Sequence, residues 1–425
     1  MKFVNVLFVV LLYCTHLSAQ VTLPNNLYFT HIGVEDGLCQ NTVCCILQDH
    51  LGFIWLGTKD GLTRYDGYRF RVFKHDAADP MSIGNNFIRV LYEDADGLIW
   101  IGTNVGVYIY NPETENFRKF DVATERGDVI SREVSSIKCD SSGDLWIGVN
   151  WQGVFRYDRR DESLELYEPV PGDTTSLSSV HVWDLCFDGD GNLWVGSQNG
   201  GLDRYDRETD RFVRHRLKGL SDVSRIVLDK QNQLLLGTMK DGLFSFNPYM
   251  GTCQPLLLDS GHKDLFVRAI FVRNSREVVV GTENGIYIYD CVTRKTRHVN
   301  QELGNPYSLS CKAVYSIYCD KEGALWIGTY FGGVNYLPPS SSLIFDKFYP
   351  IGHSDRLSGK AVREFVRDES GIIWIGTEDQ GLNRFDPVSG KFTHYNSRNS
   401  GLSCDNVHGL CVDGDRLYIG TFFGG

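Results

Sequence analysis

The sequence has few features that would indicate an enzyme, a metal site or a nucleic-acid interface. Lys and Arg number 42 against 53 Asp and Glu in 425 residues, so the formal net charge is −11. A negative chain without a basic run lacks the clustered cations that phosphate-backbone binding requires. We find no Cys-x-x-Cys pair, no Cys/His spacing suited to zinc, no His-Glu-x-x-His motif and no nucleophile elbow. We therefore expect no nucleic-acid partner, no metal, no other cofactor and no catalytic residues.

Long hydrophobic runs are equally scarce, and the main one stands at the start of the chain. Lys2 precedes an apolar stretch over residues 4–13, and small residues lead up to Ala19. The stretch is shorter than the roughly 20 residues that a bilayer-spanning helix needs, and the pattern is that of a secretory signal peptide. We expect residues 1–20 to be a signal peptide and the mature protein to be exported to the periplasm. Membrane attachment would require regions absent from this sequence.

What the sequence does contain is an internal repeat. Its core reads Asp-x-x-Gly-x-(Ile/Leu)-Trp-(Ile/Val)-Gly-Thr, as in residues 49–58, and a Gly-(Leu/Val)-x-x-Tyr-Asp segment follows. The glycine before the threonine recurs at spacings between 41 residues (Gly196 to Gly237) and 48 residues (Gly148 to Gly196). It stands at Gly57, Gly102, Gly148, Gly196, Gly237, Gly281, Gly328, Gly376 and Gly420. Nine such copies predict an array of equivalent structural units.

Each unit has the pattern of four short strands. Apolar positions such as Val43 and Ile46 mark a first strand, which an Asp-x-x-Gly turn closes. Ile-Trp-Ile-Gly forms the second strand, Gly-Leu-x-Arg-Tyr-Asp the third, and a looser aromatic segment such as residues 117–120 the fourth. Four antiparallel strands in about 45 residues make one propeller blade, and no unit shows a long helical period. The fold class that we expect is all-β: a seven-bladed β-propeller of four-stranded antiparallel blades, followed by the start of a second propeller.

The repeats divide the mature chain into two propeller regions. Residues 21–340 would hold repeats 1–7 in a closed ring, and residues 341–425 would hold repeat 8 and a truncated repeat 9. A ring must hide its sheet edges, and a strand from a chain terminus commonly completes the last blade. We expect residues 27–31 to supply that strand, with residues 343–348 as the alternative. A break at Pro338 and Pro339 would separate the two regions.

Three features of the repeat suggest functional sites, but packing explains them better. Six equivalent tryptophans could form a sugar-binding platform, yet their fixed place on a buried strand predicts contacts between blades. Residues 188–192 resemble a calcium loop but lack the later glycine and acid that such a loop needs, so we expect a plain turn. Eleven cysteines remain after Cys14 is removed with the signal peptide, and many recur on the first strand. This placement predicts mostly free, buried thiols.

These repeats resemble the two-component regulator propeller repeat, found in the sensor half of hybrid two-component systems of gut Bacteroides and relatives. Residues 371–377 and 324–336 carry the resemblance most clearly. It implies two seven-bladed propellers in the periplasm, followed by an immunoglobulin-like domain, a membrane helix, a histidine kinase, a receiver and a DNA-binding region. It also implies sensing of glycan breakdown products, control of polysaccharide-utilisation genes and a homodimeric full-length receptor.

The sequence departs from that family pattern because it stops inside the ninth repeat, at Gly425. We therefore expect it to lack the kinase, the membrane helix and the DNA-binding region, and not to be an enzyme, although the full-length family member would be a histidine kinase. The predicted function is an extracytoplasmic ligand-sensing region that detects glycan-derived oligosaccharides. The alternatives are a secreted propeller glycoside hydrolase or lyase, and a protein-interaction propeller.

One position of the repeat escapes the packing rule and indicates a ligand site. The residue five before each repeat's Asp varies around the first ring while its neighbours stay apolar. Aromatic rings can stack on sugars and arginine can bind a carboxylate or sulfate, so we expect an oligosaccharide, with an acidic one fitting best. The alternatives are that the arginines pair with acids in a solvated channel, or that the ligand lies between two propellers. The candidate ligand-binding residues are Arg89, Trp183, Arg268 and Tyr315 at this position, Asp184 and Arg225 one step further, and Trp151 and Tyr330 in the turns between second and third strands.

Overall fold

The computed structural model describes residues 22–217, 220, 222–257, 265–339, 347–350 and 356–424. The predicted signal peptide, residues 1–20, lies outside these residues. The described part contains strands, turns and one short 3-10 helix, η1 (Val34–Asp36), but no α-helix. The all-β prediction is therefore confirmed.

Seven four-stranded antiparallel sheets make up the first region, and each follows the order predicted from one repeat. The first three sheets contain β2 (Val43–Gln48), β3 (Ile54–Thr58), β4 (Gly61–Tyr65), β5 (Phe70–Phe73); β6 (Ile88–Glu93), β7 (Ile99–Thr103), β8 (Gly106–Asn111), β9 (Asn116–Lys119); and β10 (Val134–Cys139), β11 (Leu145–Val149), β12 (Gly153–Asp158), β13 (Ser163–Tyr167). The next three contain β14 (Val182–Phe187), β15 (Leu193–Ser197), β16 (Gly201–Asp206), β17 (Arg211–His215); β18 (Arg225–Leu228), β19 (Leu234–Gly237), β20 (Leu243–Asn247), β21 (Thr252–Leu257); and β22 (Val267–Val272), β23 (Glu277–Thr282), β24 (Gly285–Asp290), β25 (Lys295–Val299). The seventh contains β26 (Val314–Cys319), β27 (Leu325–Thr329), β28 (Val334–Leu337) and β1 (Thr30–Ile32).

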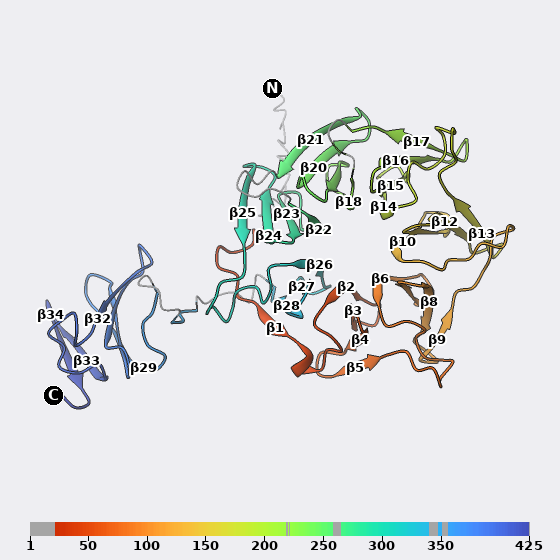
Figure 1. Cartoon of the computed structure of the whole chain (residues 1–425). Helices are drawn as coiled ribbons and strands as arrows, with labels where there is room; N and C mark the ends of the chain where they lie inside the picture. Colours follow the sequence, from red (N-terminus) through yellow and green to blue (C-terminus); the bar gives the residue numbers. More distant parts are fainter. Residues whose placement is uncertain are drawn as a thin grey trace, which may run out of the picture.

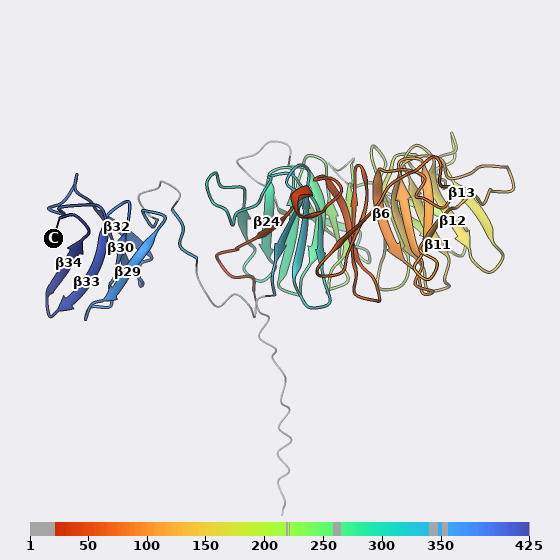
Figure 2. The ribbon, with the colours of Figure 1, turned by 90° about the horizontal axis from the view of Figure 1, so that it is seen from below.

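The seven sheets form a closed ring with their first strands innermost (Figure 1). Each inner strand lies beside the inner strand of the next sheet, and β26 of the seventh sheet lies beside β2 of the first. Seen edge-on, the ring is a flat disc (Figure 2). This arrangement is the predicted propeller, and its seven sheets are consistent with the expected seven blades.

The N-terminal segment completes the last sheet, three residues later than expected. Thr30, His31 and Ile32 pair with Tyr336, Asn335 and Val334 of β28. The predicted strand at residues 27–31 therefore overlaps β1 at two residues. Phe29 explains the shift, because its ring is buried in the core of the sixth and seventh sheets and its N–H bonds to the Tyr307 carbonyl. The competing segment, residues 343–348, lies outside the described residues except for Lys347 and Phe348, which are not in a strand.

The glycine that sets the repeat period is the point where neighbouring sheets touch. A Cβ added to Gly102 would lie 2.6 Å from a methyl group of Val134, the first residue of the next inner strand. The same contact closes the ring, since a Cβ on Gly328 would lie 2.9 Å from the Cβ of Val43. Val134 and Val43 are fully buried. Only glycine permits this close approach of two sheets, which explains its recurrence at every repeat.

The repeated tryptophans pack blade against blade, as predicted. The ring of Trp55 lies 5.0 Å from that of Tyr110 in the next sheet, and Trp326 of the seventh sheet lies 6.0 Å from Tyr65 of the first. Each indole N–H also bonds to the turn aspartate of its own repeat, at 2.7 Å from Trp55 to Asp49. The equivalent donor–acceptor distances are 2.8 Å in Trp100–Asp94, 3.1 Å in Trp146–Asp140, 2.8 Å in Trp194–Asp188, 2.8 Å in Trp326–Asp320 and 2.8 Å in Trp374–Asp368. The aspartate thus holds both the turn and the tryptophan.

The calcium-like segment is a turn of this kind. Asp188 accepts bonds from the backbone N–H groups of Asp190 and Asn192 through one oxygen and from Trp194 through the other. The eleven cysteines of the described residues are free, as expected. The expectation that most are buried was wrong, because only Cys186 is fully buried. Of the others, nine are partly exposed and Cys411 is exposed.

A further four-stranded sheet and a two-stranded sheet lie outside the ring (Figure 1). They contain β29 (Val362–Arg367), β30 (Ile373–Thr377), β31 (Leu382–Asp386) and β32 (Lys391–Tyr395), then β33 (Val407–Asp413) and β34 (Arg416–Thr421). Residues 347–350 contact both regions. The Lys347 ammonium lies 4.2 Å from the Tyr307 ring of the first region, and the Phe348 ring lies 4.9 Å from Phe385 of β31.

Candidate functional site

Six of the seven inner strands of the ring carry one residue that the neighbouring strand does not pair, and β18 of the fifth sheet pairs without such a shift. In the first sheet the pairing shifts register between Val43 and Cys45, so Cys44 is bulged out of the ladder. A bulge bends the strand and re-aims the unpaired side chain. Equivalent shifts isolate Arg89, Ser135, Trp183, Arg268 and Tyr315. These are the variable positions singled out in the sequence, and the bulge is the physical reason why they escape the packing rule.

The bulged side chains surround a single cavity, here called the mouth cavity. All seven sheets contribute to it, so it lies on the axis of the ring where the inner strands begin. Its volume is about 110 Å³. It is lined by Cys44, Arg89, Glu133, Val134, Ser135, Asn150, Val182, Trp183, Arg225, Arg268 and Tyr315. Five of the eight predicted ligand-binding residues therefore converge here: Arg89, Trp183, Arg225, Arg268 and Tyr315.

Two of the three arginines in the mouth cavity are paired with glutamates. Arg89 lies 3.2 Å from Glu133 and donates to the Asn104 side chain at 2.7 Å. Arg268 lies 2.5 Å from Glu283. Both pairs are partly exposed, so each contributes little to stability by itself but fixes the direction of a guanidinium. Arg89 and Arg268 are therefore paired with acids, as the alternative interpretation of the sequence predicted, although neither partner is Asp184.

Arg225 is held differently. Its Nε donates to the Arg268 carbonyl at 2.7 Å and one terminal nitrogen donates to the Ser224 carbonyl at 2.8 Å. Among the described residues no carboxylate lies within 4.0 Å of its guanidinium. Burial lowers the pKa of Arg225, nearby Asp184 opposes this shift, and Arg268 and Arg89 add to it. An intrinsically very basic guanidinium stays charged under these conditions, so Arg225 is a partly buried cation without a carboxylate partner among the described residues.

Aromatic side chains alternate with cations around the mouth cavity. The Arg268 guanidinium lies 3.9 Å from the Phe266 ring and 4.5 Å from the Tyr315 ring. Tyr315 in turn stacks on Tyr330, with ring centroids 5.1 Å apart. The Lys59 ammonium lies 4.2 Å from the Tyr330 ring. These contacts hold the cations by cation–π attraction and leave a rim of aromatic and charged groups.

Two groups in the cavity differ from the rest in their chemistry. Trp183 has a buried indole nitrogen with no hydrogen-bond partner among the described residues, and its ring contacts Phe266. Cys44 has a thiol whose pKa burial raises to about 11, although Arg89, Lys59 and Arg268 oppose the shift. The thiol is therefore neutral near pH 7 and is not an activated nucleophile.

The other three predicted residues lie close to the mouth cavity but do not line it. Trp151 is 63% exposed and rests edge-on against His181, with centroids 4.1 Å apart. Asp184 is not part of the cavity lining, and its oxygens accept bonds from the Ser136 hydroxyl and the Ile226 N–H. Tyr330 stacks on Tyr315.

Several residues of the site were missed in the sequence. Glu133 and Phe266 directly precede the first residue of an inner strand, and Glu283 follows the repeat threonine. They share a position in the sequence: each lies in the loop that enters a sheet or in the turn between second and third strands, near a variable position. That signal does not reveal which acid pairs with which arginine, because Glu283 lies in a turn of the same sheet as Arg268, whereas Glu133 reaches Arg89 from the loop that enters the next sheet.

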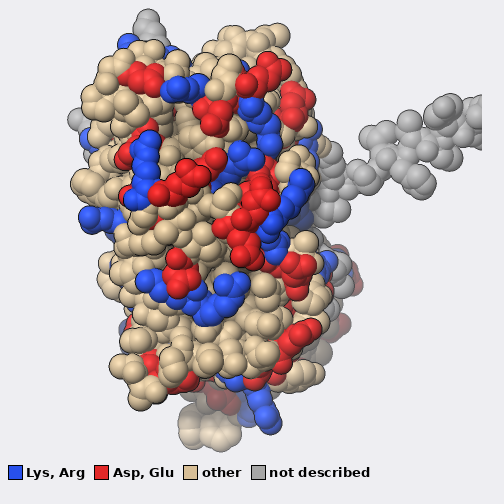
Figure 3. All heavy atoms as spheres, turned by 90° about the vertical axis from the view of Figure 1, so that its right-hand side faces the viewer, with Lys and Arg blue, Asp and Glu red and all other residues tan. Residues whose placement is uncertain are grey.

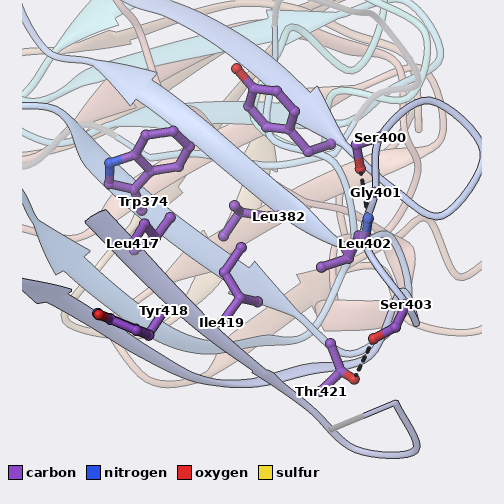
Figure 4. A pocket seen from close by; sticks show the side chains of 11 residues that line it. Trp374, Leu382, Ser400, Gly401, Leu402, Ser403, Leu417, Tyr418, Ile419 and Thr421 are labelled. Atoms are coloured by element: carbon purple, nitrogen blue, oxygen red, sulfur yellow. Dashed lines mark hydrogen bonds between the residues drawn. The ribbon is translucent and has the colours of Figure 1, made fainter. Parts of the chain in front are cut away.

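A cavity larger than the mouth cavity lies outside the ring and has another origin. It measures about 590 Å³ and lies between β30–β32 and the two-stranded β33–β34 sheet, where Trp374, Leu382 and Ile419 meet (Figure 4). In the ring the same place beside Trp146 is filled by Tyr205 of the third strand of the next sheet. The cavity is therefore an inter-sheet space beside a sheet of two strands, and we do not treat it as a ligand site.

The outer side of the ring carries interspersed charges. On the face shown in Figure 3, Lys and Arg alternate with Asp and Glu without a large field of one sign. In the described residues no group of three or more His, Cys, Asp or Glu side chains is placed to hold a metal ion. Within the same residues no helix is long and apolar enough to cross a membrane.

Comparison with known proteins agrees with this architecture. The family model of the two component regulator propeller matches residues 37–60, 82–105, 176–199 and 308–331. Four repeats of the chain match the two-component regulator propeller repeat. Each matched segment ends in the second-to-third-strand turn of its sheet, and each contains a bulged residue: Cys44, Arg89, Trp183 or Tyr315.

Relatives with these repeats are parts of signalling proteins. A histidine kinase of Formosa agariphila is 39% identical over 59 residues, which are 14% of this chain and 4% of that protein. The extracellular domain of a hybrid two-component system from B. thetaiotaomicron is 27% identical with a TM-score of 0.77, and the match covers 93% of this chain and 52% of that domain. A streptogramin B lyase, 13% identical with a TM-score of 0.54 over 73% of this chain and 97% of the lyase, shares the fold alone. The chain thus spans about half the length of the extracellular domain that it matches.

Proposed function

We propose that this chain is the ligand-sensing part of a hybrid two-component sensor and that it binds a glycan-derived oligosaccharide at the mouth cavity. One observation carries the proposal: the variable residues of six inner strands are bulged and line one cavity that combines arginines with aromatic rings. The similarity to an extracellular domain of a hybrid two-component system supports the sensor role. Export to the periplasm, a homodimeric receptor and kinase activity of the full-length protein belong to the same proposal.

The geometry suits recognition by a ring of rigid elements. Arg89, Trp183 and Arg268 come from the second, fourth and sixth sheets, so one ligand would contact residues that are far apart in the sequence. Such a ligand binds the closed ring and not the unfolded chain, and it would therefore raise the apparent stability of the whole ring. Exposed aromatic side chains beside the cavity, such as Trp151, offer faces on which further sugar units can stack.

The test is calorimetry with a panel of plant, host and algal oligosaccharides on the mature chain and on a triple variant with Arg89→Ala, Trp183→Ala and Arg268→Ala. The expected result is one panel member that binds the mature chain and loses at least tenfold in affinity with the variant. Circular dichroism and thermal melting show whether the variant is folded. Unchanged affinity in a folded triple variant would place the site elsewhere, for example between two propellers.

A catalytic alternative finds no support in the site. Glu133, which lines the mouth cavity, and Glu283, the partner of Arg268, are each engaged by an arginine, at 3.2 Å and 2.5 Å. A glycoside hydrolase needs one carboxyl group as a proton donor and a second as a nucleophile or base, which these ion pairs oppose. Incubating the same oligosaccharide panel with the protein and analysing the products by mass spectrometry separates binding from turnover.

A further inference from the structure

The mouth cavity holds one cation more than its ion pairs balance. Arg89 and Arg268 have Glu133 and Glu283 as partners, whereas Arg225 has no carboxylate within 4.0 Å among the described residues. Asp184 is near, but its oxygens are taken up by the Ser136 hydroxyl and by backbone N–H groups. An enclosed cation without an anion is costly, so an anionic group entering the cavity would be favoured.

A neutral hydrogen-bond donor in the same cavity is also unused. The indole nitrogen of Trp183 is buried and has no partner among the described residues. An indole N–H can only donate, so it requires an acceptor oxygen. Buried donors in folded proteins are nearly always satisfied, and an orphan that lines a cavity therefore indicates an absent acceptor. Trp183 and Arg225 come from adjacent sheets and line the same cavity, so one oxyanion can meet both needs.

From these two observations we propose that the mouth cavity binds a singly charged oxyanion of its ligand, a carboxylate or a sulfate ester, through Arg225 and the indole N–H of Trp183. The inference rests on the proposed function and names the chemical class of the ligand: an acidic sugar. The single unpaired arginine favours one negative charge over the two of a phosphate monoester. Lys59 is a further cation near the rim, but it is bonded to the Tyr330 hydroxyl at 3.1 Å outside the cavity lining.

The size of the cavity agrees with a head group and not with a whole sugar. Its volume of about 110 Å³ corresponds to three or four water molecules of about 30 Å³ each. A carboxylate or sulfate fits this space, while the attached ring must remain at the rim. There Trp151 and Phe331 present rings that are 63% and 70% exposed. The ligand would thus insert its charged group and lay its sugar ring across the entrance.

The test uses the indole N–H signals of the mature chain in proton–nitrogen correlation spectra. The sequence has eight tryptophans, so few signals need assignment, and Trp183→Phe identifies the signal of interest. Three probes are titrated: glucuronate as the carboxylate, glucose 6-sulfate as the sulfate ester, and glucose as the neutral control. We expect a saturable shift of the Trp183 signal with one or both acidic sugars, no shift with glucose, and at least tenfold weaker binding in Arg225→Met. The other seven signals report whether that variant keeps its fold, and Arg71→Met on the outer strand β5 serves as the matched control.

The outcomes test the oxyanion inference and the sensor proposal separately. An equal response to glucose and glucuronate would overturn the oxyanion inference but leave the mouth cavity as the ligand site. An unchanged response in folded Arg225→Met would do the same. If no probe shifts Trp183 while calorimetry finds an oligosaccharide that binds, the sensor proposal stands and the oxyanion inference fails. Absence of binding in both experiments would overturn both.

Discussion

Replacing Asp203 by Asn should stabilise the ring near neutral pH. Asp203 lies on β16 and is completely buried. One of its oxygens accepts bonds from the Ser178 N–H and hydroxyl, at 2.8 Å and 2.6 Å, while the other has no partner among the described residues. The seventh sheet and the sheet after the ring have Asn335 and Asn383 at the equivalent position, and both bond to a serine in the same way.

The magnitude follows from the pKa of this carboxyl. Burial raises the pKa of Asp203 from 3.8 to about 6, although the bonds from Ser178 and the charge of Arg214 oppose the shift. Below pH 4 the carboxyl is protonated in both the folded and the unfolded chain, and its burial does not lower the free energy of unfolding. Between pH 4 and 6 the unfolded chain loses the proton first, so the free energy of unfolding falls as the pH rises. Above pH 6 the free energy of unfolding has fallen by roughly 3 kcal/mol in total, at about 1.4 kcal/mol for each unit by which the pKa is raised.

The assay is denaturant unfolding of the mature chain and of Asp203→Asn at several pH values from 4 to 7.5. The difference in free energy of unfolding should be near zero at pH 4 and reach about 1–3 kcal/mol in favour of the variant at pH 7. The reverse change, Asn335→Asp, should destabilise the seventh sheet with the mirror-image pH dependence. A difference that is flat from pH 4 to 7.5, or an Asn variant that is less stable at pH 7, would refute the reasoning.

Three more predictions test the architecture. Gly102→Ala should lower the free energy of unfolding by about 1–3 kcal/mol, measured by thermal unfolding, because its Cβ would collide with Val134. The control is Gly420→Ala, whose Cβ has no neighbour closer than 3.7 Å and which should cost less than about 0.5 kcal/mol. Equal effects of the two substitutions would contradict the sheet-contact role. Trp55→Phe should lower the free energy of unfolding, measured by calorimetry, by about 1–3 kcal/mol because it leaves the buried Asp49 oxygen unpaired. The control is Trp151→Phe at an exposed position, which should change the stability little. A chain ending near residue 340 should melt more cooperatively and remain more soluble than residues 21–425, since Phe365 on β29 is 73% exposed. Identical behaviour of the two chains in calorimetry and size-exclusion chromatography would count against that boundary.

Much of the fold could be predicted because it depends on contacts that recur in every repeat. The Asp-x-x-Gly turn, the tryptophan and the glycine each make the same local or nearest-neighbour contact, as in Asp49 with Trp55 and Gly102 with Val134. A contact repeated at a fixed period leaves a periodic trace in the sequence. The exact start of the closing strand left no such trace, because it depends on the single contact of Phe29 with the core of the sixth and seventh sheets.

The sequence by itself determined the repeat, the strand order within each sheet and the variable position that faces the ring axis. Only the tertiary structure decided how Arg89 is paired, because Glu133 reaches it from the loop that enters the next sheet. It also decided that the Asp184 oxygens bond to the Ser136 hydroxyl and the Ile226 N–H, while Trp183, one residue earlier, keeps an indole N–H without a partner among the described residues. The physical reason is that a bulge changes the direction of one side chain by local geometry, whereas pairing and burial depend on side chains that closure of the ring brings together.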